Sequence, residues 1–371
     1  MTAELRPAVF RGAVFLLMNF AMTIAIRTCA AASAAPIRVR SHSLATYAAR
    51  NKPSHSAKQA HESSLFDAEL RGMSATAQYT TQAELDIRPC VVVRFYDKQA
   101  NALPLLLFSL FASAHPHLKA LVIDTGKEPY KKLPGLLRHV NRASGKKWVH
   151  AYAKKSKDVR VAFPDFHHDD FGYVLTDMAL EDILRQKSAG SGRSRLQCDT
   201  LTFTNADNLY NPGFIPAMIK SITHGGHDLV ASHFVSHYKY SAARSTRSFD
   251  SVMSSEIRCG TLRSGENAEF VTSDKFLPCC VELGSVMVTT NAIADAKIRF
   301  VLDKLLKDGT GNSLEREVFP VAETHSFNVE YLNVTSPSDY LRNADGFFFF
   351  RLASNPKLSS SVIRRALLLH L

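Results

Sequence analysis

The sequence of 371 residues lacks several residue patterns on which common protein classes depend. Its six cysteines include no Cys-x-x-Cys pair and no set of cysteines and histidines at zinc-ligand spacing. It has no Gly-x-Ser-x-Gly elbow for a serine nucleophile, and no Gly-rich loop ending in Lys-Ser or Lys-Thr for a phosphate. An Asp-Thr-Gly triplet occurs once, at Asp124, whereas an aspartic protease needs two carboxylates that share a proton. These absences disfavour a structural zinc site, serine hydrolysis, P-loop phosphate binding and aspartic proteolysis.

Acidic residues are nearly absent from the N-terminal part of the chain. Residues 1–61 contain one acid, Glu4, and eight Lys or Arg, so they carry +7 of the net charge of +11. The other 310 residues contain 37 basic and 33 acidic side chains. Nucleic-acid-binding domains instead carry their basic surface on the folded domain. The charge distribution therefore predicts no nucleic-acid partner.

The apolar run near the N-terminus is short for a membrane span. It covers residues 12–26, fifteen residues between Arg11 and Arg27, and a spanning helix needs roughly 17–25. This length, with small residues at 30–35, is typical of a signal peptide. We predict a signal peptide or short signal-anchor over residues 1–35, and a location in the ER or Golgi lumen as a soluble or type II membrane protein. An organellar transit peptide is the alternative, because residues 5–61 are free of acids and rich in Arg, Ser and Ala.

The rest of the chain divides into a stem, a domain and a tail. Residues 36–87 lack sustained apolar periodicity and are predicted to be a flexible, basic stem. Residues 88–352 are predicted to form the folded domain, followed by a tail at 353–371, where a short amphipathic helix is expected at 362–371. Asn333-Val-Thr is a glycosylation acceptor, in keeping with secretion. In a lumenal protein Cys259 could pair with Cys279 or Cys280, a choice that the sequence leaves open.

Strand-like and helix-like patterns alternate within residues 88–352. Apolar strands at 90–96 and 118–124 enclose an apolar helix at 102–114, a spacing that predicts a right-handed crossover between parallel strands. Further strands are expected at 148–153, 171–177, 198–204, 228–233 and 281–289, and further helices at 133–142, 177–185, 212–223 and 293–306. This alternation predicts an α/β domain with a mixed, mainly parallel sheet flanked by helices.

The segment 201–213 is the most informative in the sequence. Its apolar, β-branched residues give way to Asn205-Ala206-Asp207-Asn208, and the chain then breaks at Pro212-Gly213. A buried strand would thus deliver a carboxylate and two amides to the strand end, where ligands of open α/β sheets bind. One Asp flanked by neutral oxygen ligands suits a hard divalent cation that a phosphate also holds. The alternative is an Asx-rich turn that caps the strand.

A second acidic cluster, His167-His168-Asp169-Asp170, raises the possibility of a metal-dependent phosphohydrolase. Neighbours on an extended chain face opposite ways, so these four side chains would not all reach one ion. A solvated turn is the favoured interpretation.

Taken in order, the strand at 90–96, Asp124 and Asn205-Ala206-Asp207 resemble the nucleotide-sugar glycosyltransferases of the GT-A fold, whose metal motif is usually Asp-x-Asp. The segments 173–177, 204–210 and 232–238 resemble a poorly characterised glycosyltransferase-like branch with a Thr-Asn-x-Asp-Asn motif. The resemblance covers about residues 88–352. It implies a Rossmann-like GT-A fold, and transfer of a sugar from a nucleoside-diphosphate donor to a hydroxyl of a glycan, protein or lipid, with Mn²⁺ or Mg²⁺ as cofactor.

The resemblance also implies roles for individual residues. Asp207 would bind the metal and His325 would complete its shell, while Asn205 would be a weaker, neutral contact. The residues predicted to bind the nucleotide sugar are Arg94, Tyr96, Asp124, Asp177 and Asn205. Glu282 would orient or deprotonate the acceptor hydroxyl, and Asp345 is the competing base. Because Asn205 replaces a carboxylate, a catalytically silent sugar- or nucleotide-binding protein on the same fold is the alternative function.

Overall fold

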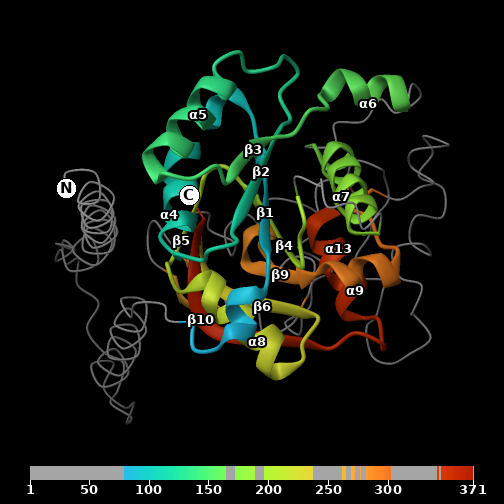
Figure 1. Cartoon of the computed structure of the whole chain (residues 1–371). Helices are drawn as coiled ribbons and strands as arrows, with labels where there is room; N and C mark the ends of the chain where they lie inside the picture. The colour runs from blue at the N-terminus through green and yellow to red at the C-terminus, as the bar shows by residue number, and fades with distance from the viewer. Residues whose placement is uncertain are drawn as a thin grey trace, which may run out of the picture.

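A computed structural model of the chain describes residues 79–163, 172–188, 196–236, 276, 281–301, 341 and 344–370, and the backbone of 261–264 and 269–271. In these residues one curled sheet is covered by helices on both faces (Figure 1). The path through the sheet runs β3-β2-β1-β4-β9-β6-β10-β5.

The first half of the sheet is entirely parallel. Its strands are β1 (Pro89–Phe95), β2 (Lys119–Asp124), β3 (Val149–Ala151) and β4 (Thr200–Asn205). Every position of β1 is buried, as expected for a β-branched run covered on both faces. The helix α4 (Leu103–Phe111) connects β1 to β2. The predicted strand–helix–strand crossover is therefore confirmed.

The second half of the sheet is mixed. The strand β9 (Val286–Thr289) runs antiparallel between β4 and β6 (Leu229–Ser236), and β10 (Ser360–His370) is parallel to β6. The short strands β7 (Thr261–Ser264) and β8 (Glu269–Val271) extend it from β6. Directly after β4, the chain forms β5 (Asn208–Tyr210), which pairs with the far strand β10. The strand that directly follows β4 therefore lies at the far end of the sheet path, beside β10.

Two separate apolar cores cover the two faces. The helices α4, α5 (Leu133–Ser144) and α8 (Phe214–Gly225) pack on one face, and α7 (Tyr173–Ser188), α9 (Thr290–Ala296) and α13 (Ala344–Ala353) pack on the other (Figure 1). In the second core the rings of Phe300 and Phe348 stack with centroids 4.0 Å apart, and Phe203 meets Phe300 edge-on. There are two further short helices, α3 (Gln82–Asp86) and α6 (Ser156–Ala162), and Val159 of α6 packs against the second core.

The mixed α/β class predicted from the sequence is confirmed, but three element predictions were wrong. The helix expected at 293–306 ends at Ala296, and residues 297–301 are not helical. Residues 362–371 were expected to form a helix in a tail, whereas 360–370 form β10 inside the sheet, so the described domain continues to His370. Hydrogen bonding to β6 over its whole length outweighs the amphipathic pattern. Residues 171–177 were expected to be a strand, whereas α7 begins at Tyr173. Its buried residues Leu175, Ala179 and Ile183 recur at a spacing of four, which is helical.

Several predictions concern residues outside the described ranges. These are the signal peptide, the stem up to residue 78, the cluster 167–170, Cys259, Cys279 and Cys280, and Asn333. The end of the predicted stem differs from a flexible segment, because residues 82–86 form α3 and Tyr79 and Ile87 pack against the core under α4. None of the helices in the described part of the chain is long and apolar enough to cross a membrane.

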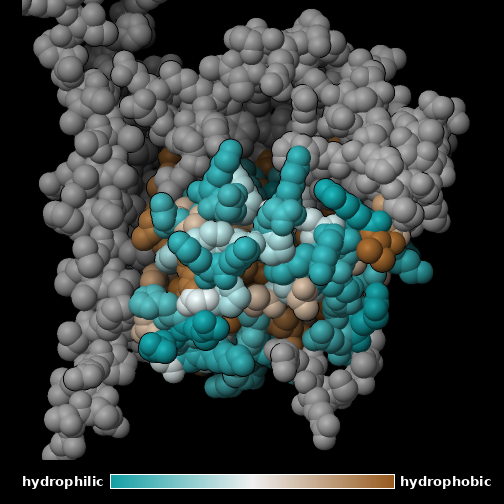
Figure 2. Space-filling model, turned by 90° about the horizontal axis from the view of Figure 1, so that it is seen from above, coloured by the Kyte–Doolittle hydropathy of each residue, from teal (hydrophilic) through white to brown (hydrophobic). Residues whose placement is uncertain are grey.

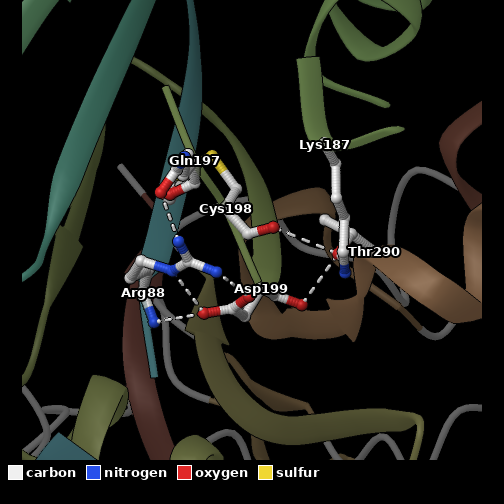
Figure 3. The surroundings of a disulfide bond; sticks show 7 residues. Arg88, Lys187, Gln197, Cys198, Asp199 and Thr290 are labelled. Atoms are coloured by element: carbon white, nitrogen blue, oxygen red, sulfur yellow. Dashed lines mark hydrogen bonds and ion pairs between the residues drawn. A yellow bond between two sulfur atoms is a disulfide. The ribbon is translucent and has the colours of Figure 1, made fainter. Parts of the chain in front are cut away.

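A disulfide that the sequence did not predict joins Cys90, at the start of β1, to Cys198, just before β4 (Figure 3). Beside it, Arg88 donates to the Asp199 carboxylate, with Nη2 and Oδ1 2.8 Å apart. The ammonium of Lys187 lies nearby and donates to the Thr290 hydroxyl. The bridge therefore ties the first and fourth strands together at their amino-terminal ends.

Removing this bridge by the double substitution Cys90→Ser and Cys198→Ser is expected to lower the free energy of unfolding by about 2–4 kcal/mol, because it links residues 108 apart in sequence. Urea unfolding followed by circular dichroism measures the change. A reductant should bring the wild type to the midpoint of the double variant and leave the variant unchanged. Equal midpoints for oxidised wild type and double variant would contradict the prediction.

Candidate functional site

Polar side chains from distant parts of the chain meet at one edge of the sheet. Because β1, β4, β6 and β10 run in the same direction, their carboxyl ends share this edge. The antiparallel strand β9 begins there, so the residues just before it also arrive at this edge. In open α/β sheets, this is where ligands bind.

Arg94 and Asn205 form the centre of the cluster. They are register partners on β1 and β4, so their side chains leave the sheet on the same face. Both Nε and Nη2 of Arg94 donate to Oδ1 of Asn205, over 3.0 and 2.7 Å. The guanidinium carbon lies 4.2 Å from the ring centroid of Tyr173, at the start of α7. Two of the predicted nucleotide-binding residues are thus brought together, and Tyr173 joins them.

Asp345 lies in the first turn of α13 and shares the electrostatic environment of Arg94. Burial raises the pKa of its carboxyl, and the positive charge of Arg94 opposes that rise. Burial likewise raises the pKa of the Tyr173 hydroxyl, again against the effect of Arg94. Asp345 therefore belongs to the cluster, and its burial favours the protonated form against the effect of Arg94.

Glu282 and His370 form a buried acid–base pair at the same edge. Oε2 of Glu282, which precedes β9, lies 3.5 Å from Nδ1 of His370, at the end of β10. The same imidazole nitrogen lies 3.4 Å from the Ser236 hydroxyl at the end of β6. Burial raises the pKa of the Glu282 carboxyl, and His370 is the leading influence that lowers it. A carboxylate whose pKa is raised is a stronger general base than a freely exposed one.

The turn after β4 packs tightly against the segment that carries Glu282. Asn208 donates from Nδ2 to the Thr204 hydroxyl over 3.0 Å, and the Tyr210 hydroxyl donates to the carbonyl oxygen of Gly284 over 3.0 Å. A Cβ at Gly284 would lie 2.6 Å from the Tyr210 oxygen, inside contact distance. Glycine is therefore required here to bring Glu282 next to the turn.

Asp207 lies in the turn between β4 and β5. Its Oδ1 atom and Oδ1 of Asn208 are buried, and within the described residues neither has a hydrogen-bond partner. Over these same residues no three His, Cys, Asp or Glu side chains converge as a metal-binding group. The arrangement fits a cation such as Mg²⁺ that takes one carboxylate and fills its remaining positions with phosphate oxygens and water. His325, the other predicted metal ligand, lies outside the described residues.

Asp124 ends β2 but is not part of this cluster. It is the register partner of Phe95, one residue after Arg94, so its side chain leaves the sheet on the opposite face. Oδ1 and Oδ2 accept the backbone N–H groups of Gly126 and Tyr130, over 3.2 and 2.8 Å. Asp124 thus orders the loop after β2, while its predicted contact with a nucleotide stays a prediction.

The last two predicted nucleotide-binding residues differ in accessibility. Tyr96 directly follows β1 and is 40% exposed, which leaves its ring open to stack on a ligand. Asp177 was expected to end a strand, but it lies inside α7 and its carboxylate accepts the backbone N–H groups of Phe300 and Val301. Burial raises its pKa to about 7, against the effect of these two donors. Its observed contacts hold the 300–301 segment in place.

Basic side chains surround the neighbouring carboxyl ends of β2 and β3. The segments 125–132 and 152–160 contain seven Lys or Arg against two acids, namely Lys127, Lys131, Lys132, Lys154, Lys155, Lys157 and Arg160 against Glu128 and Asp158. Seen from above, the described part of this face is mostly hydrophilic (Figure 2). Lys154 and Lys155 lie within ion-pair distance of Asp182 and Asp124. The remaining basic residues still outnumber the acids, so the rim of the site carries a positive charge that favours the approach of an anionic ligand.

The sequence did not predict that Tyr173, Ser236 and His370 belong to the site. Tyr173 and Ser236 lie in two of the segments that carried the resemblance, 173–177 and 232–238, but those segments gave no role for either side chain. His370 had no such signal, because it ends an apolar run with no neighbouring polar motif.

Solved structures similar to this chain are glycosyltransferases. The S. aureus TarS fragment 1–349 is 11% identical with a TM-score of 0.42, over 76% of this chain and 60% of that chain, and a second structure of it contains UDP. A mannosyltransferase from Pyrobaculum calidifontis, in complex with GDP-Man and Mn²⁺, is 13% identical with a TM-score of 0.29, over 48% of this chain and 44% of that chain. The chain thus spans about 60% of the TarS fragment. No protein-family model and no curated protein sequence matches this chain.

Proposed function

We propose that this chain is a metal-dependent glycosyltransferase that moves a sugar from a nucleoside diphosphate to an acceptor hydroxyl. The proposal rests on one observation, the convergence of buried ionisable side chains and the turn at Asp207 on a single sheet edge. In that arrangement Arg94 contacts Asn205, and Glu282 contacts His370. The mixed α/β sheet with helices on both faces is consistent with a GT-A, Rossmann-like fold.

The residues around Asp207 supply a site for the donor. Asp207 would hold the divalent cation, and a bound cation would neutralise the charge that grows on the diphosphate as the sugar bond breaks. Tyr96 is exposed at the end of β1 and would stack on the base, while Asp124 would act through the loop that it orders. The basic rim would draw the nucleotide to this edge.

Glu282 and Asp345 would act on the acceptor side. Burial raises the pKa of both carboxyls, which makes each carboxylate a stronger base toward an acceptor hydroxyl. Glu282 is favoured, because its partner is His370, whereas Asp345 shares its surroundings with Arg94. The proposed acceptor is a hydroxyl of a glycan, protein or lipid.

We place the protein in the secretory pathway, anchored or released through its N-terminal segment. The apolar run at 12–26 supports this location. The Cys90–Cys198 disulfide supports it as well, because such bridges persist in oxidising compartments.

Calorimetric titration of the full chain with UDP- and GDP-sugars in Mn²⁺ tests the proposed function. We expect saturable binding that Mn²⁺ strengthens, followed by donor hydrolysis or transfer in a product assay. Absence of binding to every donor in a folded sample would contradict the proposal.

The second candidate function is a catalytically silent nucleotide- or sugar-binding protein, and the neutral Asn205 favours it. It predicts donor binding without turnover. Detection of transfer or hydrolysis that disappears in Asp207→Ala would exclude it.

A further inference from the structure

The buried cation Arg94 has a neutral amide as its closest partner. Two of its nitrogens donate to the single oxygen Oδ1 of Asn205, and its planar group lies over the ring of Tyr173. An aspartate in place of Asn205 would form a bidentate ion pair with the guanidinium. The amide holds the same geometry but leaves the positive charge available to another anion.

One donor nitrogen of Arg94 also lacks an acceptor. The residue is 7% exposed, and in the described part of the chain its Nη1 atom is buried without a hydrogen-bond partner. A buried donor left unpaired is costly, and more so when it is charged. A ligand oxygen beside Nη1 would remove that cost.

The surroundings of Arg94 favour a phosphate as that ligand. Asn205 is two residues from Asp207, where the proposed function puts the donor diphosphate. Two acids act electrostatically on Arg94, namely Asp345 and Glu282, and burial raises the pKa of both carboxyls, which weakens their competition for the guanidinium. The fork of N–H donors on an arginine matches phosphate oxygens better than a lysine does.

We propose that Arg94, held by Asn205, binds a phosphate oxygen of the nucleoside diphosphate directly, so that the diphosphate binds even without a divalent cation. The inference rests on the proposed function and explains the departure from Asp-x-Asp. Asn205 keeps Arg94 oriented without neutralising it, and a cation on Asp207 adds to an affinity that Arg94 already provides.

Titration of the full chain with UDP, GDP and inorganic pyrophosphate, first in EDTA and then in excess Mn²⁺, tests the inference. The wild type should bind in EDTA. Asn205→Asp should weaken binding in EDTA about 10- to 100-fold, and Arg94→Gln at least as much. The affinity of Arg94→Lys in EDTA should lie between that of the wild type and that of Arg94→Gln. Arg185→Gln, on the exposed side of α7, should match the wild type.

A double variant separates neutralisation of Arg94 from simple repulsion by the new carboxylate. If Asn205→Asp acts through Arg94, adding it to Arg94→Gln should change affinity in EDTA by less than about threefold. A full additional loss would overturn the inference.

Two results on the wild type are decisive even where Arg94→Gln fails to fold. Binding in Mn²⁺ but not in EDTA would overturn the inference and leave the proposed function intact. Binding in neither condition would overturn both. Unchanged affinity of Asn205→Asp in EDTA would also overturn the inference.

Discussion

Asp207→Ala is expected to reduce sugar transfer or donor hydrolysis on the order of 100-fold or more, with little change in stability. The side chain is half-buried in a turn, and its Oδ1 atom accepts no hydrogen bond from the described residues, so its loss removes no contact that holds the fold. If it holds the cation, its removal takes away several kcal/mol of charge stabilisation on the leaving diphosphate.

The measurement compares initial rates and the Mn²⁺-dependent part of nucleotide binding in Asp207→Ala and in Asp86→Ala. Asp86 is exposed at the end of α3 and contacts Gln82, so its substitution should leave both quantities unchanged. Retention of the rate within a few-fold in Asp207→Ala, with Mn²⁺ still strengthening binding, would remove Asp207 from the metal site.

The sequence was sufficient to predict the parallel strands that carry the site. The β-branched runs that became β1, β2 and β4 lie side by side as expected, and their carboxyl ends share one edge. It was not sufficient to predict which strand-end side chains meet. Arg94 pairs with Asn205 in register, whereas Asp124 pairs with Phe95, and a shift of one residue along a strand reverses the face.

Contacts between segments distant in sequence account for what was missed. His370 reaches Glu282 because β10 adds to the sheet beside β6, and no local pattern in an apolar C-terminal run specifies such a partner. The helix α7 was mistaken for a strand at its start, where Val174 and Thr176 are β-branched, although packing on the second core makes this segment helical. Because α7 is helical from its start, Tyr173 lies beside Arg94, whereas Asp177 contacts Phe300 and Val301.

Glu282→Gln is expected to lower kcat/KM by about 10²- to 10⁴-fold and to remove the acid limb of its pH profile. The amide is nearly isosteric and keeps a hydrogen-bonding group beside His370, but it cannot accept a proton. In the wild type, the active carboxylate form of Glu282 accumulates as the pH rises through its raised pKa. The rate should therefore fall as the pH is lowered through that range.

His370→Gln tests the direction in which His370 shifts the pKa of Glu282. A positively charged His370 lowers the pKa of Glu282, so its replacement should move the acid limb to higher pH while the rate at high pH changes little. Asp345→Asn should keep an acid limb but move it in the opposite direction, to lower pH, because the charge of Asp345 raises the pKa of Glu282. Loss of the limb in Asp345→Asn, with Glu282→Gln still active, would assign the base to Asp345. An unmoved limb in His370→Gln would instead show that the buried pair does not set the protonation of the acceptor side.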